Sequence, residues 1–391
     1  MPEIITSFVQ RSFTTPNVDV TQDMINALEG ISQDGQAVFI FGEGEFFISG
    51  LVPINCNVRI IGSGCKSSKI TILEGDIFDQ YDDYFIGCFG TPSTRINVEI
   101  SNIEISTQDH STMWWNGVEK HLIKITFANH VKIHNIISRC SNAVCTNIDM
   151  RVCSNISVTG CELVNYNNSQ AGGILWMRHD TRNVQITNNR IVKYGNDEMI
   201  AFWLPSQNYD QNQLTPAPGV KENILIADND IVYEKPEWAT DIIAGVQISL
   251  FNDYNPNNPD VDVVKIKFSN FSFVNNRIII NAPITNLIGI TFGANDTHDR
   301  IVISNNSVTC TDRSSAQNSH FTMFSITDKS GCKAPVIVED NVISSAATTI
   351  DQNGYSSRTL LQLTNSSIIA SGNIYSGIGA GGNVRGCHLA A

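Results

Sequence analysis

Charged side chains are scarce in this sequence, and long apolar runs are missing. Asp, Glu, Lys and Arg make up 16% of its 391 residues, against roughly 25% in ordinary globular proteins. No apolar run approaches the roughly 18 residues that a membrane-spanning helix needs, so we expect no membrane partner. The net charge of −13 argues against a nucleic-acid partner, because an acidic surface repels phosphates. Residues 1–6 lack the basic and apolar segments of a secretory signal peptide.

The ten cysteines include no CxxC pair and no grouping with histidine that is typical of a metal site. Cys140, Cys145, Cys153 and Cys161 lie close together in the sequence, which leaves a disulfide or a zinc site as an alternative. We expect instead that they are reduced and pack in the interior as small apolar side chains. Folding in a cytosol agrees with reduced thiols. We therefore expect no metal and no other cofactor.

The sequence does contain a repeat of the form apolar-x-apolar-x-turn, which occurs ten times. Alternation with period two places both apolar side chains on one side of a β-strand. Asparagine and glycine accept the left-handed backbone of a tight turn, and stacked asparagine amides can bond from one repeat to the next. The turn residue is Asn, Asp or Gly at positions 62, 102, 135, 160, 188, 228, 275, 305, 340 and 372.

A third apolar column and a further strand complete the repeat. The column follows the turn by three residues, at Ile105, Leu163, Ile191, Ile231, Ile278, Val308, Ile343 and Tyr375. The further strands are Leu122–Phe127, Gly173–Met177, Met199–Leu204, Gly245–Phe251, Leu287–Phe292, Phe321–Ile326 and Leu360–Leu363. Three strands in a repeat of at least about 25 residues fit neither a leucine-rich repeat nor a propeller. We predict an all-β chain, a right-handed parallel β-helix with three strands in each of about ten or eleven coils.

The open end of such a stack needs a cap. Residues 21–31 predict an N-terminal capping helix, with Thr21 as its N-cap and Met24, Ile25 and Leu28 on one face. Gly30 marks its exit. We therefore divide the chain into a cap with the first strands over residues 1–50, a β-helix over 51–376 and a glycine-rich tail over 377–391.

The segment Asp19–Gly64 resembles the start of pectate-lyase-like β-helix proteins, above all phage tail spikes and appendages. There a short helix such as Asp23–Leu28 leads into a strand such as Ala37–Phe41, followed by the glycine-rich turn of Gly42 and Gly44. The resemblance covers nearly the whole chain and implies the fold. The WxDH motif of pectate lyases and the motif set of polygalacturonases are absent. No catalytic residue can therefore be transferred, because lyases, hydrolases, epimerases and non-enzymatic spikes share the architecture.

Three long polar insertions in consecutive coils, Pro205–Val220, Glu234–Asp241 and Asn252–Asp262, are the expected place for a site. Aromatic faces stack on sugars, although Trp176 and Trp203 can equally belong to the interior. A lyase would use a residue such as Arg178 or His179 to take a proton; a salt-bridged turn is the alternative. The predicted substrate-binding residues are Trp203, Tyr209, Trp238, Tyr254, Arg178 and His179.

Glycoside hydrolysis needs two carboxylates, about 5–5.5 Å apart for retention or roughly 6.5–9.5 Å apart for inversion. Adjacent coils lie about 4.8 Å apart, so carboxylates on neighbouring coils can meet either requirement. Ordinary solvated side chains are the alternative. The candidate catalytic residues are Asp180, Asp197, Glu198 and Asp241.

The outward residue between the two apolar columns changes from polar to aliphatic along the chain, and it ends with Val302, Ile337 and Ile369. An exposed aliphatic stripe predicts a partner surface, most simply a homotrimer formed through the C-terminal coils. Loops of the same chain that cover the stripe are the alternative.

Together these features predict a tail spike or appendage of a phage virion, assembled in the host cytoplasm. It would contact other virion proteins and bind bacterial surface polysaccharide. Whether it also depolymerises that polysaccharide is left open. The alternatives are a non-catalytic structural or receptor-binding spike and an extracellular bacterial lyase, hydrolase or epimerase.

Overall fold

The computed structural model of the protein describes residues 7–73, 84–108, 120–141, 145–166, 173–194, 199–204, 219–234, 244–252, 266–281, 284–292, 297–311, 321–328, 335–345, 358–364, 367–377 and 388–390. The chain divides into two compact units, which are described separately. The first comprises Met1–Leu175 and Thr187–Val192, and the second comprises Trp176–Ile186 and Lys193–Ala391.

Each coil of the first unit contains an A strand before the asparagine turn, a B strand after it and a C strand that closes the coil. The A strands are β1 (Phe8–Phe13), β3 (Gln36–Phe41), β6 (Asn57–Gly62), β9 (Ile96–Ser101), β12 (Ala128–His134) and the later part of β14 (Cys145–Thr159). The B strands are β2 (Val18–Asp19), β4 (Gly44–Ile48), β7 (Ser68–Ile72), β10 (Glu104–Thr107), β13 (Ile137–Ser141) and β15 (Glu162–Tyr166). The C strands are β5 (Val52–Ile54), β8 (Tyr84–Phe89), β11 (Lys120–Thr126) and the earlier part of β14.

The second unit repeats this plan. Its A strands are β19 (Gly219–Ala227), β22 (Ile266–Val274), β26 (Ile301–Ser304), β29 (Pro335–Glu339) and β32 (Ser367–Ser371), with β25 (Thr297–His298) beside β22. Its B strands are β20 (Asp230–Glu234), β23 (Arg277–Ile280), β27 (Ser307–Cys310), β30 (Val342–Ser345) and β33 (Ile374–Gly377). Its C strands are β18 (Ile200–Leu204), β21 (Ala244–Asn252), β24 (Ile284–Phe292), β28 (Phe321–Asp328), β31 (Arg358–Thr364) and β34 (His388–Ala390). Strands β16 (Leu175–Thr187) and β17 (Arg190–Tyr194) contribute residues to both units.

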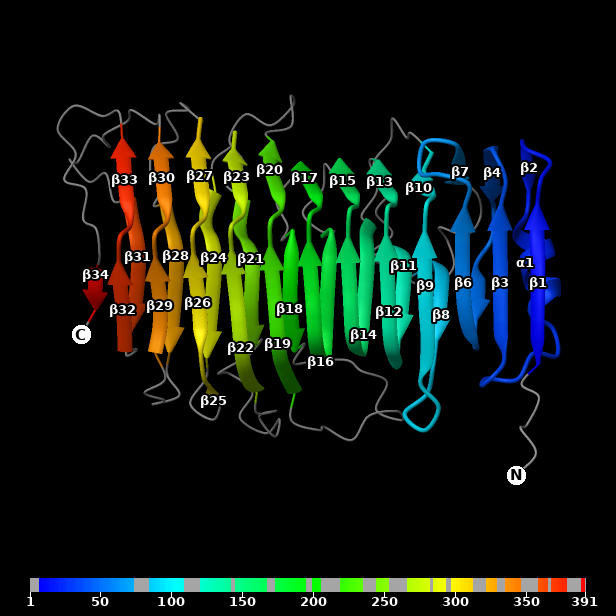
Figure 1. The fold of residues 1–391 in the computed structure, drawn as a ribbon, viewed down its shortest axis with the longest axis horizontal. Coiled ribbons are helices and arrows are strands. Elements are labelled where there is room, and N and C mark those ends of the chain that lie inside the picture. The colour runs from blue at the N-terminus through cyan, green and yellow to red at the C-terminus, as the bar shows by residue number, and fades with distance from the viewer. Residues whose placement is uncertain are drawn as a thin grey trace. The chain divides into compact units, whose positions relative to one another are not determined.

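Strands of the same class pair in parallel from coil to coil, as Figure 1 shows within each unit. In the first unit Val58, Val98, Val131 and Ile156 pair in succession, and each is at most 2% exposed. Aliphatic side chains therefore stack above one another in the interior, which removes them from water. The predicted parallel β-helix with three strands per coil is confirmed.

The predicted apolar columns hold until the last repeat. The third column, from Ile105 through Ile343, is buried, whereas the side chain of Tyr375 lies outside the description. In the last repeat Ala370 is exposed, contrary to the prediction. Its strand β32 pairs with β29 on one side, and no further A strand follows in the described residues to cover it.

The turns between A and B strands have the predicted backbone at nine of the ten positions. The residues with positive φ are Asn102, Asn135, Gly160, Asn188, Asp228, Asn275, Asn305, Asp340 and Gly372. Gly62 is the exception, because its φ is not positive. A Cβ at Gly62 would lie 2.2 Å from the carbonyl oxygen of Asn102, so a close approach of two coils explains this glycine.

A buried asparagine ladder lies one residue after these turns. At the turn residues themselves, Nδ2 of Asn135 donates to Oδ1 of Asn102 at 3.4 Å. In the second unit, Nδ2 of Asn306 donates to Oδ1 of Asn341 at 2.9 Å, and Nδ2 of Asn341 donates to Oδ1 of Asn373 at 2.9 Å. Asn229 and Asn276 continue the ladder in the other direction. Each of these amides also donates to a main-chain carbonyl, as Asn306 does to Phe273. Buried polar groups are thereby satisfied between coils.

The capping helix α1 (Thr21–Leu28) takes the place of a C strand between β2 and β3, and it packs against β1, β3 and β5. Met24 is fully buried, as predicted. The N-cap is Val20 and not Thr21, because the carboxylate of Asp19 accepts hydrogen bonds from both the N–H and the hydroxyl of Thr21. Gly30 has a φ of 78°, which fits its predicted role at the exit.

The cysteines whose side chains the structure describes are free thiols, and all but Cys65 are buried; they are Cys56, Cys65, Cys88, Cys140, Cys153 and Cys161. Burial raises the pKa of Cys56 and of Cys161 to about 11, so these thiols stay protonated and unreactive. This confirms the predicted role as small interior side chains for the described part of the chain. Within the same ranges, no helix has the length and apolarity that a membrane crossing requires.

The aliphatic stripe of the second unit is only partly exposed. Val302, Ile337 and Ile369 are register partners on β26, β29 and β32. Val302 is 7% exposed, however, so its predicted exposure is wrong, whereas Ile369 is 52% exposed. On the neighbouring B strands, Val342 and Ile374 are also register partners, and they are 44% and 60% exposed. The exposed apolar surface therefore lies at the last two coils.

Candidate functional site

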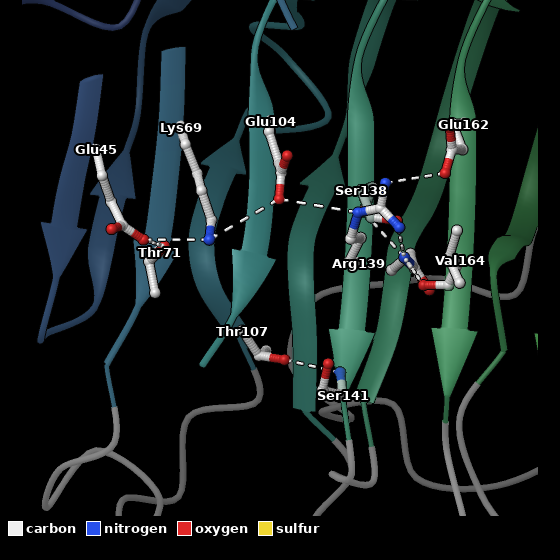
Figure 2. A network of polar contacts seen from close by, with 11 residues as sticks. Glu45, Lys69, Thr71, Glu104, Thr107, Ser138, Arg139, Ser141, Glu162 and Val164 are labelled. Carbon is white, nitrogen blue, oxygen red and sulfur yellow. Dashed lines mark hydrogen bonds and ion pairs between the residues drawn. The ribbon is translucent and has the colours of Figure 1, made fainter. Parts of the chain in front are cut away.

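The B strands of the first unit carry a row of charged side chains along one groove, which we call the glutamate groove. It has a volume of about 320 Å³. Glu45, Lys69 and Glu104 face outward at matching register positions on β4, β7 and β10. Arg139 on β13 and Glu162 on β15 extend the row (Figure 2). The groove is lined by Glu45, Phe47, Lys69, Thr71, Leu73, Glu104, Ser106, Thr107, Gln108, Arg139 and Ser141.

Charges alternate in sign along this row, and each cation lies between two carboxylates. Nζ of Lys69 is 3.1 Å from Oε1 of Glu45 and 4.0 Å from Oε1 of Glu104. Arg139 is 3.8 Å from Glu104 and 2.9 Å from Glu162. All five side chains are partly exposed, between 20% and 40%. Such pairs add little stability at a surface, but they hold the carboxylates in fixed positions.

Hydroxyl groups form another part of the groove wall, beside Phe47, Leu73 and Gln108. The hydroxyl of Thr71 donates to Oε1 of Glu45 at 2.5 Å. This bond, together with Lys69, lowers the pKa of Glu45 below its ordinary value against the opposing effect of burial. The main-chain N–H of Ser141 donates to the Thr107 hydroxyl at 2.8 Å, which ties β13 to β10 at the end of the groove.

Ser106 differs from the other hydroxyl residues of the wall. It is 3% exposed, and strand alternation places it on the same face as Glu104. Its register partners are Thr71 and Arg139. Its Oγ is sealed from solvent and makes no hydrogen bond within the described part of the chain. The groove therefore contains a buried hydroxyl whose bonding capacity is unused.

A second groove of about 400 Å³ lies over the A strands of the same unit. Arg59 donates to both carboxylate oxygens of Glu99, at 2.9 and 3.3 Å. His134 lies 3.4 Å from the same carboxylate. Burial alone would raise the pKa of Glu99, but these two partners offset it and leave the pKa lowered. The chain's own side chains bind this carboxylate, as Lys69 and Arg139 bind those of the glutamate groove. Within the described residues, what distinguishes the glutamate groove is the Ser106 hydroxyl.

The C strands of the first unit bury an ionic cluster. Asp149 is fully buried, and its Oδ2 lies 2.6 Å from Nε of Arg151 and 3.4 Å from Nε2 of His121. His121 is 1% exposed. A buried carboxylate requires such partners, so we assign this cluster to the support of β11 and β14.

Three predicted site residues, Arg178, His179 and Asp180, lie on β16 in the second unit. Asp180 accepts a hydrogen bond from the N–H of Val220 at 2.8 Å and lies 3.6 Å from Arg182. His179 has a φ of 59°. The ammonium of the buried Lys221 donates to the carbonyls of Met177 and His179 and to the Thr181 hydroxyl. The chain's own groups therefore bind Asp180 and the carbonyl of His179, and the catalytic and substrate-binding roles of these residues stay predictions.

Trp176, which could have stacked on a sugar, is 2% exposed and therefore belongs to the interior. The Arg178 guanidinium lies 4.4 Å from the centre of its ring. Trp203 is on β18, but its side chain is outside the description. The remaining predicted site residues lie outside the described residues; they are Asp197, Glu198, Asp241, Tyr209, Trp238 and Tyr254.

Sequence reasoning missed the glutamate groove, although the repeat contains a signal for it. Glu104 and Glu162 each follow their turn residue by two positions, at Asn102 and Gly160. The outward position of the B strand therefore carries a carboxylate in both coils. No group of three or more His, Cys, Asp and Glu side chains in the described ranges could hold a metal ion.

No protein-family model matches the sequence, and no curated protein matches it. Solved structures do share the fold. The DFA-IIIase from Arthrobacter chlorophenolicus A6 in complex with GF2 has a TM-score of 0.58 at 13% identity, over 96% of this chain and 89% of that chain. The same DFA-IIIase without its lid has a TM-score of 0.54 at 12% identity, over 97% and 92%. An exopolygalacturonase from Thermotoga maritima has a TM-score of 0.48 at 10% identity, over 94% and 92%. The similarity to DFA-IIIase establishes a parallel β-helix, whose activity has to be argued from its site.

Proposed function

We propose that this protein is a phage tail spike or appendage that binds a bacterial surface polysaccharide in the glutamate groove. The observation that carries the proposal is a polar groove that runs across the B strands of stacked coils, with carboxylates held in place by Lys69 and Arg139. Ionised carboxylates accept hydrogen bonds from sugar hydroxyls, and fixed acceptors bind without losing side-chain entropy. The helix-to-strand start at α1 and β3, which resembles that of tail spikes, supports the same assignment.

The proposal also places the protein on the virion, among other tail proteins. A spike with several copies of the groove would gain avidity on a repetitive polysaccharide, which compensates for weak individual contacts. The DFA-IIIase that shares the fold is crystallised in complex with GF2 and with DFA-III, which is consistent with a ligand-binding role for this architecture.

Binding to capsule or lipopolysaccharide of candidate host bacteria tests the proposal. We expect retention on affinity gels that contain the correct glycan, and at least a tenfold loss of affinity in Glu104→Gln, because this carboxylate lies between both cations. The control is Glu99→Gln, which breaks an arginine–glutamate pair of 2.9 Å on the A strands, closer than the 3.8 Å between Arg139 and Glu104. An equal effect of both variants would contradict the assignment of the groove.

Hydrolysis is a second candidate activity of the same groove, favoured by the spacing of Glu45 and Glu104. Both carboxylates lie within 4.0 Å of one ammonium, so their separation cannot exceed the sum of these two short distances. This upper limit is compatible with the roughly 5–5.5 Å of retaining glycosidases and with the lower end of the roughly 6.5–9.5 Å of inverting ones. The lowered pKa of Glu45 keeps this carboxylate ionised, as a general base requires.

New reducing ends after incubation with the bound glycan would demonstrate hydrolysis, whereas the ultraviolet absorbance of an unsaturated uronate product would indicate a lyase. If Glu45 and Glu104 are the catalytic pair, Glu45→Gln should abolish cleavage and leave the glycan retained. Retention with no cleavage by the unmodified protein would assign it to the non-catalytic spikes.

A further inference from the structure

The charge balance of the glutamate groove restricts which polysaccharide it can hold. Two carboxylates, Glu45 and Glu104, and two cations line the groove, and a third carboxylate, Glu162, contacts Arg139 from the next strand. Each cation already contacts two carboxylates, so neither Lys69 nor Arg139 is available to neutralise an added anion. The lowered pKa of Glu45 keeps that carboxylate ionised even in mild acid. A polymer with a carboxylate, sulfate or phosphate on every repeat would therefore meet repulsion here, which the net charge of −13 strengthens.

Ser106 supplies a second, independent indication of a ligand. A buried hydroxyl without a hydrogen bond is unfavourable in the free protein, and Ser106 is in that state on the face that lines the groove. Its register partner Arg139 reaches away from it, toward Glu104 and Glu162. A hydroxyl of a bound sugar, once a side chain moves to admit it, would supply the missing bond.

The spacing of the groove also fits a sugar chain. Equivalent side chains repeat from strand to strand about every 4.8 Å, which is comparable with the length of one pyranose ring. A glycan that lies across β4, β7, β10, β13 and β15 would therefore meet an alternating acceptor and donor at each ring. This alternation suits hydroxyl groups, which both donate and accept hydrogen bonds, better than it suits anions, which only accept them.

We propose that the glutamate groove selects a polysaccharide of uncharged sugars, and that the Ser106 hydroxyl hydrogen-bonds a ligand hydroxyl. The inference depends on the proposed function, because it specifies the substrate class of the same groove. It excludes polyuronates and sulfated or phosphorylated glycans as the preferred ligands.

Affinity electrophoresis through gels that contain one polymer each would test this, with dextran and mannan as uncharged polymers and polygalacturonate and alginate as polyuronates. We expect retention by an uncharged polymer that changes less than about twofold between low and 0.5 M salt. Ser106→Ala should weaken that retention about three- to tenfold, which is the range of one neutral hydrogen bond. It should also raise the Tm, since it removes an unsatisfied buried group.

The matched control is Ser138→Ala. Ser138 is fully buried on β13, and its Oγ accepts a hydrogen bond from Asn147 at 2.9 Å. This variant should therefore lower the Tm without changing retention. If Ser106 has only a structural role, Ser106→Ala will change the Tm and leave the retention unaltered, and that result would overturn the inference.

Other outcomes separate this inference from the proposed function. Retention by a polyuronate that is stronger than retention by either uncharged polymer would overturn the substrate class and leave glycan binding intact. Retention by none of the four polymers, and by none of the host glycans tested above, would overturn the proposed function itself. Retention by an uncharged polymer that is insensitive to both Ser106→Ala and Glu104→Gln would place the site outside the groove.

Discussion

Amide hydrogen bonds, as well as aliphatic packing, join the side chains of neighbouring coils in the second unit. Asn306 is 1% exposed and receives hydrogen bonds from the N–H and the side-chain amide of Asn276, at 2.9 and 3.1 Å. It donates in turn to Asn341 and to the carbonyl of Phe273. One asparagine therefore satisfies groups in two neighbouring coils, so its loss leaves several buried groups unpaired.

We expect Asn306→Ala to lower the free energy of unfolding by about 3 kcal/mol, because each unsatisfied buried polar group costs roughly 1–3 kcal/mol. Chemical denaturation of the purified chain measures this. Ser307→Ala, at the exposed neighbouring position on β27, is the control and should change stability by less than about 0.5 kcal/mol. Equal effects of the two substitutions would show that the ladder contributes no net stability.

The Thr71 hydroxyl sets the ionisation of Glu45. We expect Thr71→Val to raise the pKa of Glu45 toward its ordinary value of 4.5, as measured by NMR titration. Because the pKa of Glu45 is lowered in the folded protein, ionised Glu45 stabilises the fold at neutral pH. This contribution to the free energy of unfolding is lost as the pH falls through the ordinary glutamate range and below. The pKa of Glu99, which is lowered by Arg59 and His134, should not change. An unaltered pKa of Glu45 would contradict the role of this hydrogen bond.

Among the elements, the turn after β6 depends on how closely two coils approach. A Cβ at Gly62 would meet the Asn102 carbonyl at 2.2 Å, whereas a Cβ at Gly64 would meet nothing closer than 3.5 Å. Gly62→Ala should therefore destabilise the first unit by about 1–3 kcal/mol, the usual cost of overpacking. Gly64→Ala, two residues further on, should change the midpoint of denaturation little. A similar midpoint for both variants would refute the close-approach explanation.

The strands and turns of both units could be predicted because each is specified locally. Alternating valine and isoleucine define a buried strand face, and Asn102 or Asn305 defines a left-handed turn, without reference to the rest of the chain. The glutamate groove could not be predicted in this way. Glu45 and Glu104 lie on either side of Lys69, which is the register partner of both. Because the coils differ in length, the sequence does not show which residues are register partners. The predicted exposure of Val302 was wrong for the same reason, because the burial of a side chain depends on the neighbouring coils.

At the scale of the whole molecule, the exposed apolar residues of the last two coils support the predicted homotrimer. Ile369 and Ile374 are 52% and 60% exposed, and surfaces of this kind favour association. Light scattering should give a mass about three times 43.0 kDa. The double variant Ile369→Asp/Ile374→Asp should shift the mass to that of one chain. Phe8→Asp, at an exposed apolar residue of the first unit, should leave the trimer intact, and a monomeric unmodified protein would refute the prediction.

The helix α1 occupies the position at which the first coil would otherwise have a third strand. A helix has no free row of main-chain donors and acceptors along its side, so it cannot template a strand from another molecule. In the described part of this coil, β1 and the two-residue β2 are the remaining strand edges, and β1 presents Arg11, which forms an ion pair with Asp23 of the helix. Among the described residues, the helix therefore leaves less strand edge for end-to-end addition of another molecule than a third strand would leave.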